Sequence, residues 1–199
     1  MCIRQTLVLA VVLIGLVPIR SEAQSPVELR GGIGLTTTSY DAEIVDHFNL
    51  ASRGWGFQGT FAPRFYNYVG VLVEIGWEYW GPLCAGSSCE SDWTSTSSVM
   101  ASLGAGLASP VLFVNDPSGR IGFGLTLNAG REWIKSGLSQ DYCLNCTIDD
   151  LDVKGGFWFE PGLDLVADPS VVIGFTYRIY ESEADMNSRL TFRIIHSSR

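Results

Sequence analysis

The sequence predicts an all-β protein, an eight-stranded antiparallel up-and-down transmembrane β-barrel, from three features of the chain. First, Val69–Trp80 carries an apolar residue at every odd position, whereas glycine and glutamate occur among its even positions. A period of two indicates a strand whose two faces lie in different environments. Second, seven other segments repeat this alternation. Third, the connections between the segments are alternately long and short, which favours a barrel with loops at one end and tight turns at the other.

Each expected strand is defined by alternating apolar positions that face away from glycine, hydroxyl and charged side chains. Val69–Trp80 exceeds the about 9–11 residues that a tilted strand needs to cross a bilayer. In chain order the strands, with their apolar positions in parentheses, are Val27–Thr38 (Leu29, Ile33, Leu35), Arg53–Phe65 (Trp55, Phe57, Phe61), Val69–Trp80 (Val71, Val73, Ile75, Trp77), Ser98–Leu112 (Val99, Leu103, Leu107), Arg120–Trp133 (Ile121, Phe123, Leu125, Leu127), Leu151–Leu165 (Val153, Phe157, Phe159, Leu163), Val171–Tyr180 (Ile173, Phe175, Tyr177) and Arg189–His196 (Leu190, Phe192, Ile194).

The connections fall into two classes by length. The long ones are acidic and polar, and the short ones carry turn-forming residues. The long connections are Ser39–Ala51, Gly81–Thr96 and Lys135–Asp149, and the short ones are Tyr66–Tyr68, Asn115–Gly119 and Ala167–Pro169. Prolines 63, 110 and 161 interrupt strands near the short turns, where the loss of a ladder donor is tolerated.

The Tyr66–Tyr68 turn predicts the register of its hairpin. A three-residue loop places Phe65 opposite Val69. The pairs Phe61–Val73, Phe57–Trp77, Trp55–Tyr79, Thr60–Glu74 and Gly56–Glu78 then follow. Both faces of the hairpin stay consistent in this register, whereas a shift of one residue would mix them.

Residues 1–23 have the pattern of an export signal, which leaves residues 24–199 as one barrel domain. Arg4 precedes an apolar run over Thr6–Ile19, and Ser21-Glu22-Ala23 fits a cleavage site with small residues. The alternative is a transmembrane anchor, but the run is short and Pro18 breaks it. The chain carries 13 basic and 21 acidic residues. This balance argues against nucleic acid as a partner, because Lys and Arg contacts to phosphate dominate such binding.

Four cysteines remain once Cys2 leaves with the signal, and they suggest disulfides in an oxidising compartment. Three pairings are open, of which the sequence favours the local pairs Cys84–Cys89 and Cys143–Cys146. Four thiolates at these spacings are also a set that zinc accepts. The export signal favours disulfides, so we expect neither a metal nor another cofactor.

Alternation alone leaves open which face points outward. A soluble lipocalin-like barrel would turn its apolar face inward around a cavity. In this chain the other face is rich in glycine and carries both signs of charge, as expected where space is short and charges must pair. We therefore expect a lumen charge network of Glu28, Arg30, Arg64, Glu74, Glu78, Glu132, Asp152, Lys154, Glu160, Asp164, Arg178 and Arg193. Aromatic residues at the strand ends, such as Trp55, Trp77 and Trp133, have the placement of interfacial girdles.

The expected network includes one specific contact. If Leu165 pairs with Val171, Trp158 lies opposite Arg178 and Glu160 lies opposite Thr176. Arg178 then stacks on the indole of Trp158 and reaches Glu160 diagonally. Such pairing would close the lumen, because an isolated charge inside is expensive.

With this strand pattern, the chain resembles the eight-stranded outer-membrane barrels of the OmpA/OmpX type from about Val27 to His196. The resemblance implies a monomer in the bacterial outer membrane, surrounded by membrane lipid and lipopolysaccharide, with extracellular loops that act on an unknown surface partner. One feature departs from the pattern. Such chains commonly end on an aromatic residue that serves as the assembly signal, whereas this one ends Ile194–Arg199, with Phe192 as the nearest aromatic.

A lipid A-modifying enzyme is the alternative function. His47 with Asp46, and Ser91 with Asp92, lie in long loops, as in the eight-stranded lipid A palmitoyltransferases. His196-Ser197-Ser198 is similar to the His-x-Ser of lipid A deacylases. A charged lumen would not hold an acyl chain, and nucleophile, base and orienting group are not visible together. We therefore expect a non-enzymatic protein with no catalytic residues.

Overall fold

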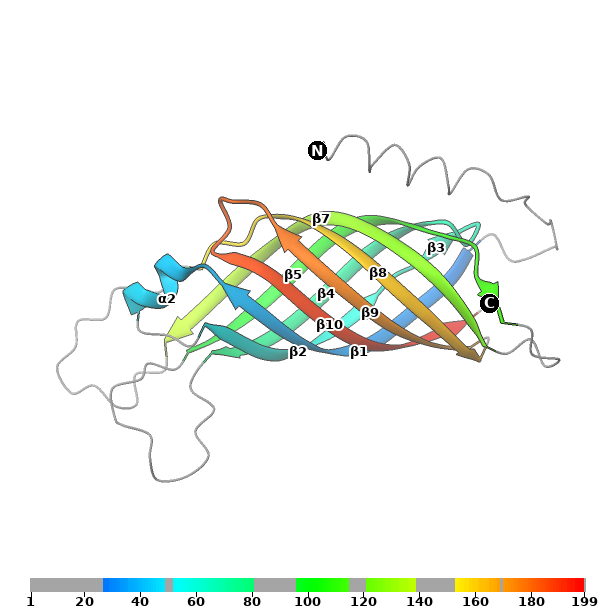
Figure 1. Cartoon of the computed structure of the whole chain (residues 1–199), viewed down its shortest axis with the longest axis horizontal. Helices are drawn as coiled ribbons and strands as arrows, with labels where there is room; N and C mark the ends of the chain where they lie inside the picture. The colour runs from blue at the N-terminus through cyan, green and yellow to red at the C-terminus, as the bar shows by residue number, and fades with distance from the viewer. Residues whose placement is uncertain are drawn as a thin grey trace, which may run out of the picture.

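The computed structural model describes residues 27–48, 52–80, 96–114, 121–138, 153–168 and 170–198, which form a barrel of antiparallel strands (Figure 1). The expected export signal lies outside these residues and stays a prediction. The elements are β1 (Val27–Tyr40), α2 (Ala42–Phe48), β2 (Arg53–Phe61), β3 (Arg64–Phe65), β4 (Val69–Trp80), β5 (Thr96–Ala108), β6 (Leu112–Phe113), β7 (Gly122–Leu138), β8 (Phe157–Asp168), β9 (Val171–Tyr180) and β10 (Met186–Ser198).

The sheet closes on itself. Each long strand pairs antiparallel with its neighbours in the order β1, β2, β4, β5, β7, β8, β9 and β10, and β10 pairs back onto β1 with Ile194 opposite Ile33. The short strands β3 and β6 extend two of the long ones: β3 continues β2 past Pro63, and β6 follows β5 after Pro110. The predicted eight-stranded barrel is therefore confirmed. Closure leaves no strand edge open in the wall.

The hairpin of β2, β3 and β4 has the predicted register. Phe65 pairs with Val69, and Thr60 pairs with Glu74. At the turn, Tyr66 and Asn67 both have positive φ, at 52° and 64°, and the Tyr68 N–H donates to the Phe65 carbonyl at 3.1 Å. Two consecutive positive φ values give the turn that matches the twist of the flanking strands.

The outer wall of the barrel is apolar and its interior is polar. On β1, Ile33 is 74% exposed, whereas on β4 the inward Glu74 and Glu78 are 4% and 0% exposed. This arrangement inverts that of a soluble protein and suits a barrel surrounded by lipid, where backbone groups must pair within the strand ladder because no water is available. The predicted direction of the two faces is confirmed, and the lipocalin-like alternative, with its apolar face inward, is wrong.

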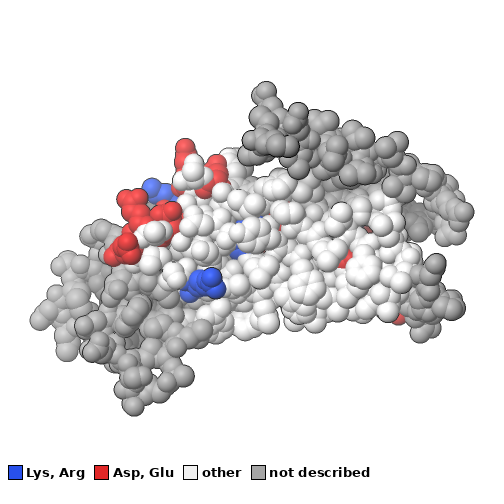
Figure 2. Space-filling view, in the orientation of Figure 1, with Lys and Arg blue, Asp and Glu red and all other residues white. Residues whose placement is uncertain are grey.

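The barrel has two different ends (Figure 1). At the loop end, β1, β4, β7 and β9 finish, and α2 follows β1 with the Glu43 N–H donating to Asp41 at 2.9 Å as a helix cap. The turn end carries β3, β6 and Ser198 at the end of β10. Acidic side chains gather at the loop end in Figure 2, whereas the wall between the ends shows few charges. Among the described residues, no helix has the length and apolarity to cross a bilayer.

The predicted start of the sixth strand is wrong. Leu151–Leu165 was the expected range, but β8 begins at Phe157. Lys154 is exposed rather than in the lumen, and Val153 is buried at 1% exposed. Gly155 and Gly156 interrupt the alternation. In a regular strand Val153 and Phe157 would share a face because they are four residues apart, but here Val153 is buried and Phe157 points outward. Asp152, expected beside Lys154, lies outside the described residues.

Candidate functional site: the charged barrel interior

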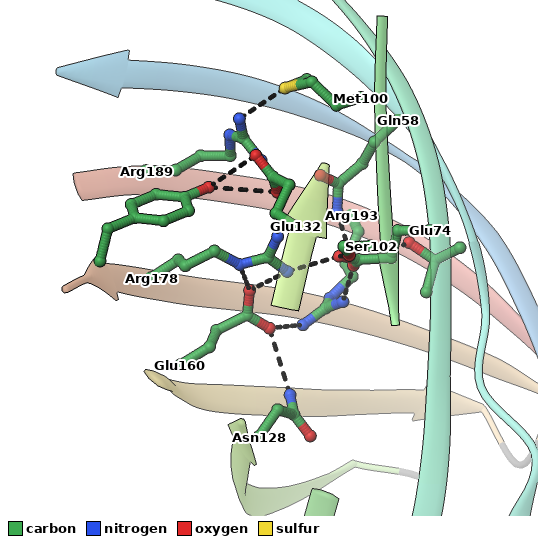
Figure 3. A network of polar contacts seen from close by, with 12 residues as sticks. Gln58, Glu74, Met100, Ser102, Asn128, Glu132, Glu160, Arg178, Arg189 and Arg193 are labelled. Atoms are coloured by element: carbon green, nitrogen blue, oxygen red, sulfur yellow. Dashed lines mark hydrogen bonds and ion pairs between the residues drawn. The ribbon is translucent and has the colours of Figure 1, made fainter. Parts of the chain in front are cut away.

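Arg178 of β9 is the centre of a buried network of charged side chains (Figure 3). Its Nε donates to Glu160 Oε2 at 2.9 Å, its Nη1 donates to Glu132 Oε2 at 2.7 Å, and its Nη2 donates to Glu74 Oε2. The side chains of all four residues are at most 4% exposed. One guanidinium thus connects β4, β7 and β8 across the lumen.

Two arginines of β10 complete the charge pairing. Arg193 donates to Glu74 Oε1 at 3.2 Å and to Glu160 Oε1 at 2.9 Å. Arg189 donates to Glu132 Oε2 at 2.6 Å and to Glu78 Oε2 at 3.3 Å. Strand β10 pairs with both β9 and β1, so its inward arginines lie close to Arg178 and face the glutamates of the opposite wall.

Neutral side chains add hydrogen bonds to Glu74 and Glu160. Gln58 Nε2 and Ser102 Oγ each donate to Glu74 at 2.9 Å. Asn128 Nδ2 donates to Glu160 at 3.1 Å. Buried charges are tolerated only where they are both paired and hydrogen-bonded, and these contacts supply the second condition.

Aromatic rings cover two of the guanidinium groups. The Arg178 Cζ lies 4.0 Å from the centroid of the Trp158 ring, so the predicted stacking contact is confirmed. The Arg189 Cζ lies 5.7 Å from the centroid of Tyr180, whose hydroxyl also donates to Glu132 at 3.2 Å. Such cation–π contacts are favourable in a site from which water is excluded.

The register that was expected to produce this contact is wrong. Leu165 pairs with Ile173 instead of Val171, and Trp158 pairs with Tyr180 instead of Arg178. The cause is that β8 continues to Asp168, which pairs with Val171 and so makes the turn shorter than expected. An irregularity between Val166 and Asp168 then sets the pairing of the rest of the two strands. Arg178 reaches Trp158 diagonally.

A second cluster of charges lies nearer the turn end. Nη1 and Nη2 of Arg30 both donate to Asp164 Oδ2 at 3.1 Å, and Arg64 Nη2 donates to the same oxygen at 3.1 Å. Glu28 accepts from Ser197 Oγ. The hollow beside this cluster has a volume of about 30 Å³. That space suits a few water molecules at most.

An apolar cluster, here called the apolar cap, closes the loop end of the lumen. Its buried members come from β1, β4, β8, β9, β10 and the segments that precede β8 and β10, and Ile44 and Val45 of α2 pack against them. The Tyr40 and Trp80 rings are 3.4 Å apart at their centroids. The buried members at the loop end are Tyr40, Trp80, Val153, Tyr180, Ala184 and Met186, and Trp158 and Leu72 continue the cluster toward the turn end. Described side chains therefore fill the interior from one end to the other, as expected for a barrel of about eight strands.

The structure brings ten of the twelve expected lumen charges to inward positions, places one outside the lumen and does not describe the other. The ten are Glu28, Arg30, Arg64, Glu74, Glu78, Glu132, Glu160, Asp164, Arg178 and Arg193. Lys154 is exposed, and Asp152 lies outside the described residues together with Cys84, Cys89, Cys143 and Cys146. The expected set omitted Arg189, although its place on the polar face of the last strand was a signal that could have included it.

His196 and Ser197, the catalytic candidates whose side chains the structure describes, do not face a common site. His196 is exposed on the outer wall near the turn end, whereas Ser197 points inward and bonds to Glu28. The side chain of His47 lies outside the described residues, as do Ser91 and Asp92. No group of three or more His, Cys, Asp or Glu side chains within the described ranges is arranged to hold a metal ion.

No protein-family model matches the sequence, and no curated protein matches it. Solved outer-membrane proteins resemble the structure at low identity. Neisserial surface protein A is 11% identical over 88% of this chain and 98% of its own, with a TM-score of 0.49. OprG from Pseudomonas aeruginosa is 10% identical over 87% and 95%, with a TM-score of 0.46. Ail from Yersinia pestis, solved with the heparin analogue sucrose octasulfate, is 15% identical over 86% and 97%, with a TM-score of 0.41.

Proposed function

We propose that this protein is a non-enzymatic barrel of the bacterial outer membrane that holds its long loops at the cell surface and conducts few or no ions. The observation that carries the proposal is the filled interior. Arg178, Arg189 and Arg193 connect glutamates from opposite walls at the middle of the lumen. A barrel whose interior is occupied in this way serves as a scaffold for its ends.

The remaining space in the lumen supports the absence of conduction. The hollow beside Glu74 and Met100 has a volume of about 10 Å³, and the one beside Asp164 about 30 Å³. Each holds at most a few waters, since one water already occupies about 10–15 Å³ on this measure, and neither alone spans the barrel. The apolar cap of Trp80 and Tyr180 then separates the charged middle from the loop end.

The outer wall supports the location in a membrane. Three tryptophans, Trp55, Trp77 and Trp133, are 38%, 39% and 50% exposed on the loop half of the wall. Trp55 contacts Trp77 edge to face, with ring centroids 6.2 Å apart. Interfacial aromatics of this kind mark the headgroup level of membrane barrels. Membrane lipid and lipopolysaccharide would surround the wall, and a closed sheet without free edges favours a monomer.

The loop end supports a role in surface contact or envelope integrity. Acidic side chains from α2 and from the β9–β10 turn are grouped there, including Glu43, Asp46, Glu181 and Glu183 (Figure 2). The sequence places two further long connections, Gly81–Thr96 and Lys135–Asp149, at the same end. A surface partner would meet this end first, and a negative surface would favour a basic or metal-bridged partner.

Lipid A modification is the alternative function, and the interior speaks against it. An acyl chain needs an apolar chamber, whereas the described lumen holds ion pairs around Glu160 and Glu132. His196 lies on the outer wall near the turn end, on the opposite side of the membrane from the surface leaflet in the proposed topology. Lipid A mass spectrometry of cells with and without the protein separates the two functions, because an enzyme would change acylation or phosphorylation.

Membrane fractionation with heat-modifiable gel mobility tests the proposal. The protein should sediment with the outer membrane, and the unboiled sample should migrate as a compact species that boiling converts to the full apparent mass. A protein found in the soluble fraction, with the same mobility before and after boiling, would contradict it.

A further inference from the structure

Strand β7 carries two basic residues on the lipid-facing wall. Arg131, Trp133 and Lys135 occupy alternate positions of the strand, and all three side chains are exposed. Alternate residues of a strand share a face, so these three form one outward line, here called the β7 patch. Arg131 and Lys135 are four residues apart, which corresponds to about 13 Å along the strand.

Arg131 lies among apolar neighbours. Its cross-strand partners are Leu103 on β5 and Phe157 on β8, which are 51% and 56% exposed on the same wall. The Arg131 Cζ is 5.2 Å from the centroid of the Phe157 ring. Within the described ranges, no ion pair connects Arg131 to a carboxylate. A charge on the lipid face of a barrel is unfavourable unless it reaches the interface or an anion.

The height of the β7 patch on the barrel identifies the region that Arg131 reaches. Trp133 belongs to the same half of the wall as Trp55 and Trp77, and tryptophans of this kind lie at the headgroup level. Arg131 precedes Trp133 on the side toward the middle of the barrel, and Lys135 follows it on the side toward the loop end. A long arginine side chain extends along the wall toward the interface, where lipid phosphates lie.

From this placement we infer that the β7 patch binds lipid A, with Arg131 and Lys135 each pairing with one phosphate of its headgroup. The choice of leaflet, and hence of lipid A, rests on the proposed function, which directs the loop end outward. Arginine binds phosphate through two parallel hydrogen bonds, and lysine binds it as a point charge. Two bases whose Cα atoms lie about 13 Å apart can each reach a phosphate of their own, which suits a headgroup with two separated phosphates better than a lipid with one.

Trp133 has a positioning role in this site. It lies between the two bases on the same face and is 50% exposed, so its ring presents an apolar surface at the boundary between sugar and acyl chains. The exposed Leu103 and Phe157 on either side of Arg131 continue this surface toward the membrane interior. The β7 patch therefore combines two phosphate-binding side chains with an aromatic ring between them, and it lies beside the apolar surface of Leu103 and Phe157.

Arg53 provides a matched control. It is the first residue of β2, pairs with Ser39 and is exposed at the same end of the barrel. Two strands, β4 and β5, separate β2 from β7. Replacing Arg53 removes one outward base of similar exposure without changing the β7 patch.

The experiment uses the folded protein in neutral detergent micelles, titrated with bisphosphorylated lipid A and followed by native mass spectrometry of lipid adducts. The wild type should retain one lipid A, and the double variant Arg131→Gln/Lys135→Gln should bind it about tenfold or more weakly, as expected for the loss of charge-assisted hydrogen bonds. Arg53→Gln should bind like the wild type. Dephosphorylated lipid A and phosphatidylglycerol should bind the wild type as weakly as lipid A binds the double variant.

Several results would overturn this site. Equal lipid A binding by the wild type and the double variant would do so, as would an equal loss in Arg53→Gln, which would indicate unspecific attraction. Binding of phosphatidylglycerol as tight as that of lipid A would exclude the two-phosphate headgroup. Heat-modifiable mobility verifies folding in each sample. A wild type that lacks this mobility would contradict the proposed function, whereas a folded wild type that retains no lipid A would contradict the β7 patch alone.

Discussion

Arg178 lies over the indole ring of Trp158, with its Cζ 4.0 Å from the ring centroid, while its three guanidinium nitrogens bond to glutamates from three other strands. The ring covers one face of the guanidinium, and the carboxylates occupy its edge. This arrangement gives each of the three nitrogens of a fully buried arginine a carboxylate partner. It also makes one side chain a connection between β4, β7, β8 and β9.

The first prediction concerns the stability contributed by this residue. Arg178→Ala would leave Glu74, Glu132 and Glu160 with fewer positive partners in a buried site. We expect the free energy of unfolding in lipid vesicles to fall by about 3–5 kcal/mol if the site is dry, and by less if water enters. Urea titration followed by tryptophan fluorescence measures it. Arg53→Ala, at an exposed position, should change it by at most about 0.5 kcal/mol, and an unchanged stability of Arg178→Ala would refute the pairing.

The second prediction uses two glycines of β2 that face opposite ways. A Cβ added at the inward Gly56 would press on the carbonyl oxygen of Trp77 and come within 2.8 Å of the Glu78 Cα, both of which are backbone atoms. The outward Gly59 has the Ile75 carbonyl oxygen 3.8 Å from its added Cβ, which is ordinary contact.

Gly56→Ala should therefore destabilise the barrel by about 1–3 kcal/mol, as expected for overpacking against atoms that cannot move aside. Gly59→Ala should stay within about 0.5 kcal/mol of the wild type. Unfolding in the same vesicles compares the two variants. Equal stability of both would show that the inward face of β2 has more room than the structure contains.

The sequence allowed the strands, their faces and the first hairpin to be predicted because these features depend on local pattern. Val69–Trp80 and Val171–Tyr180 have the predicted bounds, and the Tyr66–Tyr68 turn sets the predicted register. Alternation also indicated which charges point inward. It failed at Lys154, where two consecutive glycines add a residue and reverse the faces.

The partners inside the lumen were less accessible to prediction. Arg178 and Glu74 are 104 residues apart in sequence, and their contact depends on the stagger of every strand between them. The turn between β8 and β9 is shorter than expected, with Asp168 opposite Val171, and the β8–β9 register differs by two residues from the expected one, although Arg178 still reaches Trp158. Arg189 is a different case, because alternation places it on the same inward face as Arg193, so the sequence did contain the signal for it.

The third prediction concerns the four cysteines in the long connections, all of which lie outside the described residues. We expect local disulfides Cys84–Cys89 and Cys143–Cys146, because an exported chain meets an oxidising compartment. Peptide mapping under non-reducing conditions should recover each pair as a linked fragment. Four free thiols, a cross-link between the two connections, or bound zinc would each contradict this pairing.

The fourth prediction concerns topology. An epitope tag inserted after Ser88 should be labelled by antibody on intact cells, since the long connections belong to the loop end and we propose that this end faces outward. A tag inserted between Asn67 and Tyr68, in the turn at the opposite end, serves as the control and should be labelled only after permeabilisation. The reverse pattern would show that the barrel is inverted.

Electrical recording across a planar lipid bilayer tests the filled lumen most directly. The wild-type protein, inserted from detergent and verified as folded by its gel mobility, should produce no large, steady current steps at any applied voltage, because Arg178, Arg189 and Arg193 pair with glutamates across the lumen and the cap of Trp80 and Tyr180 closes it. Large, steady single-channel currents from the wild type would contradict the closed interior.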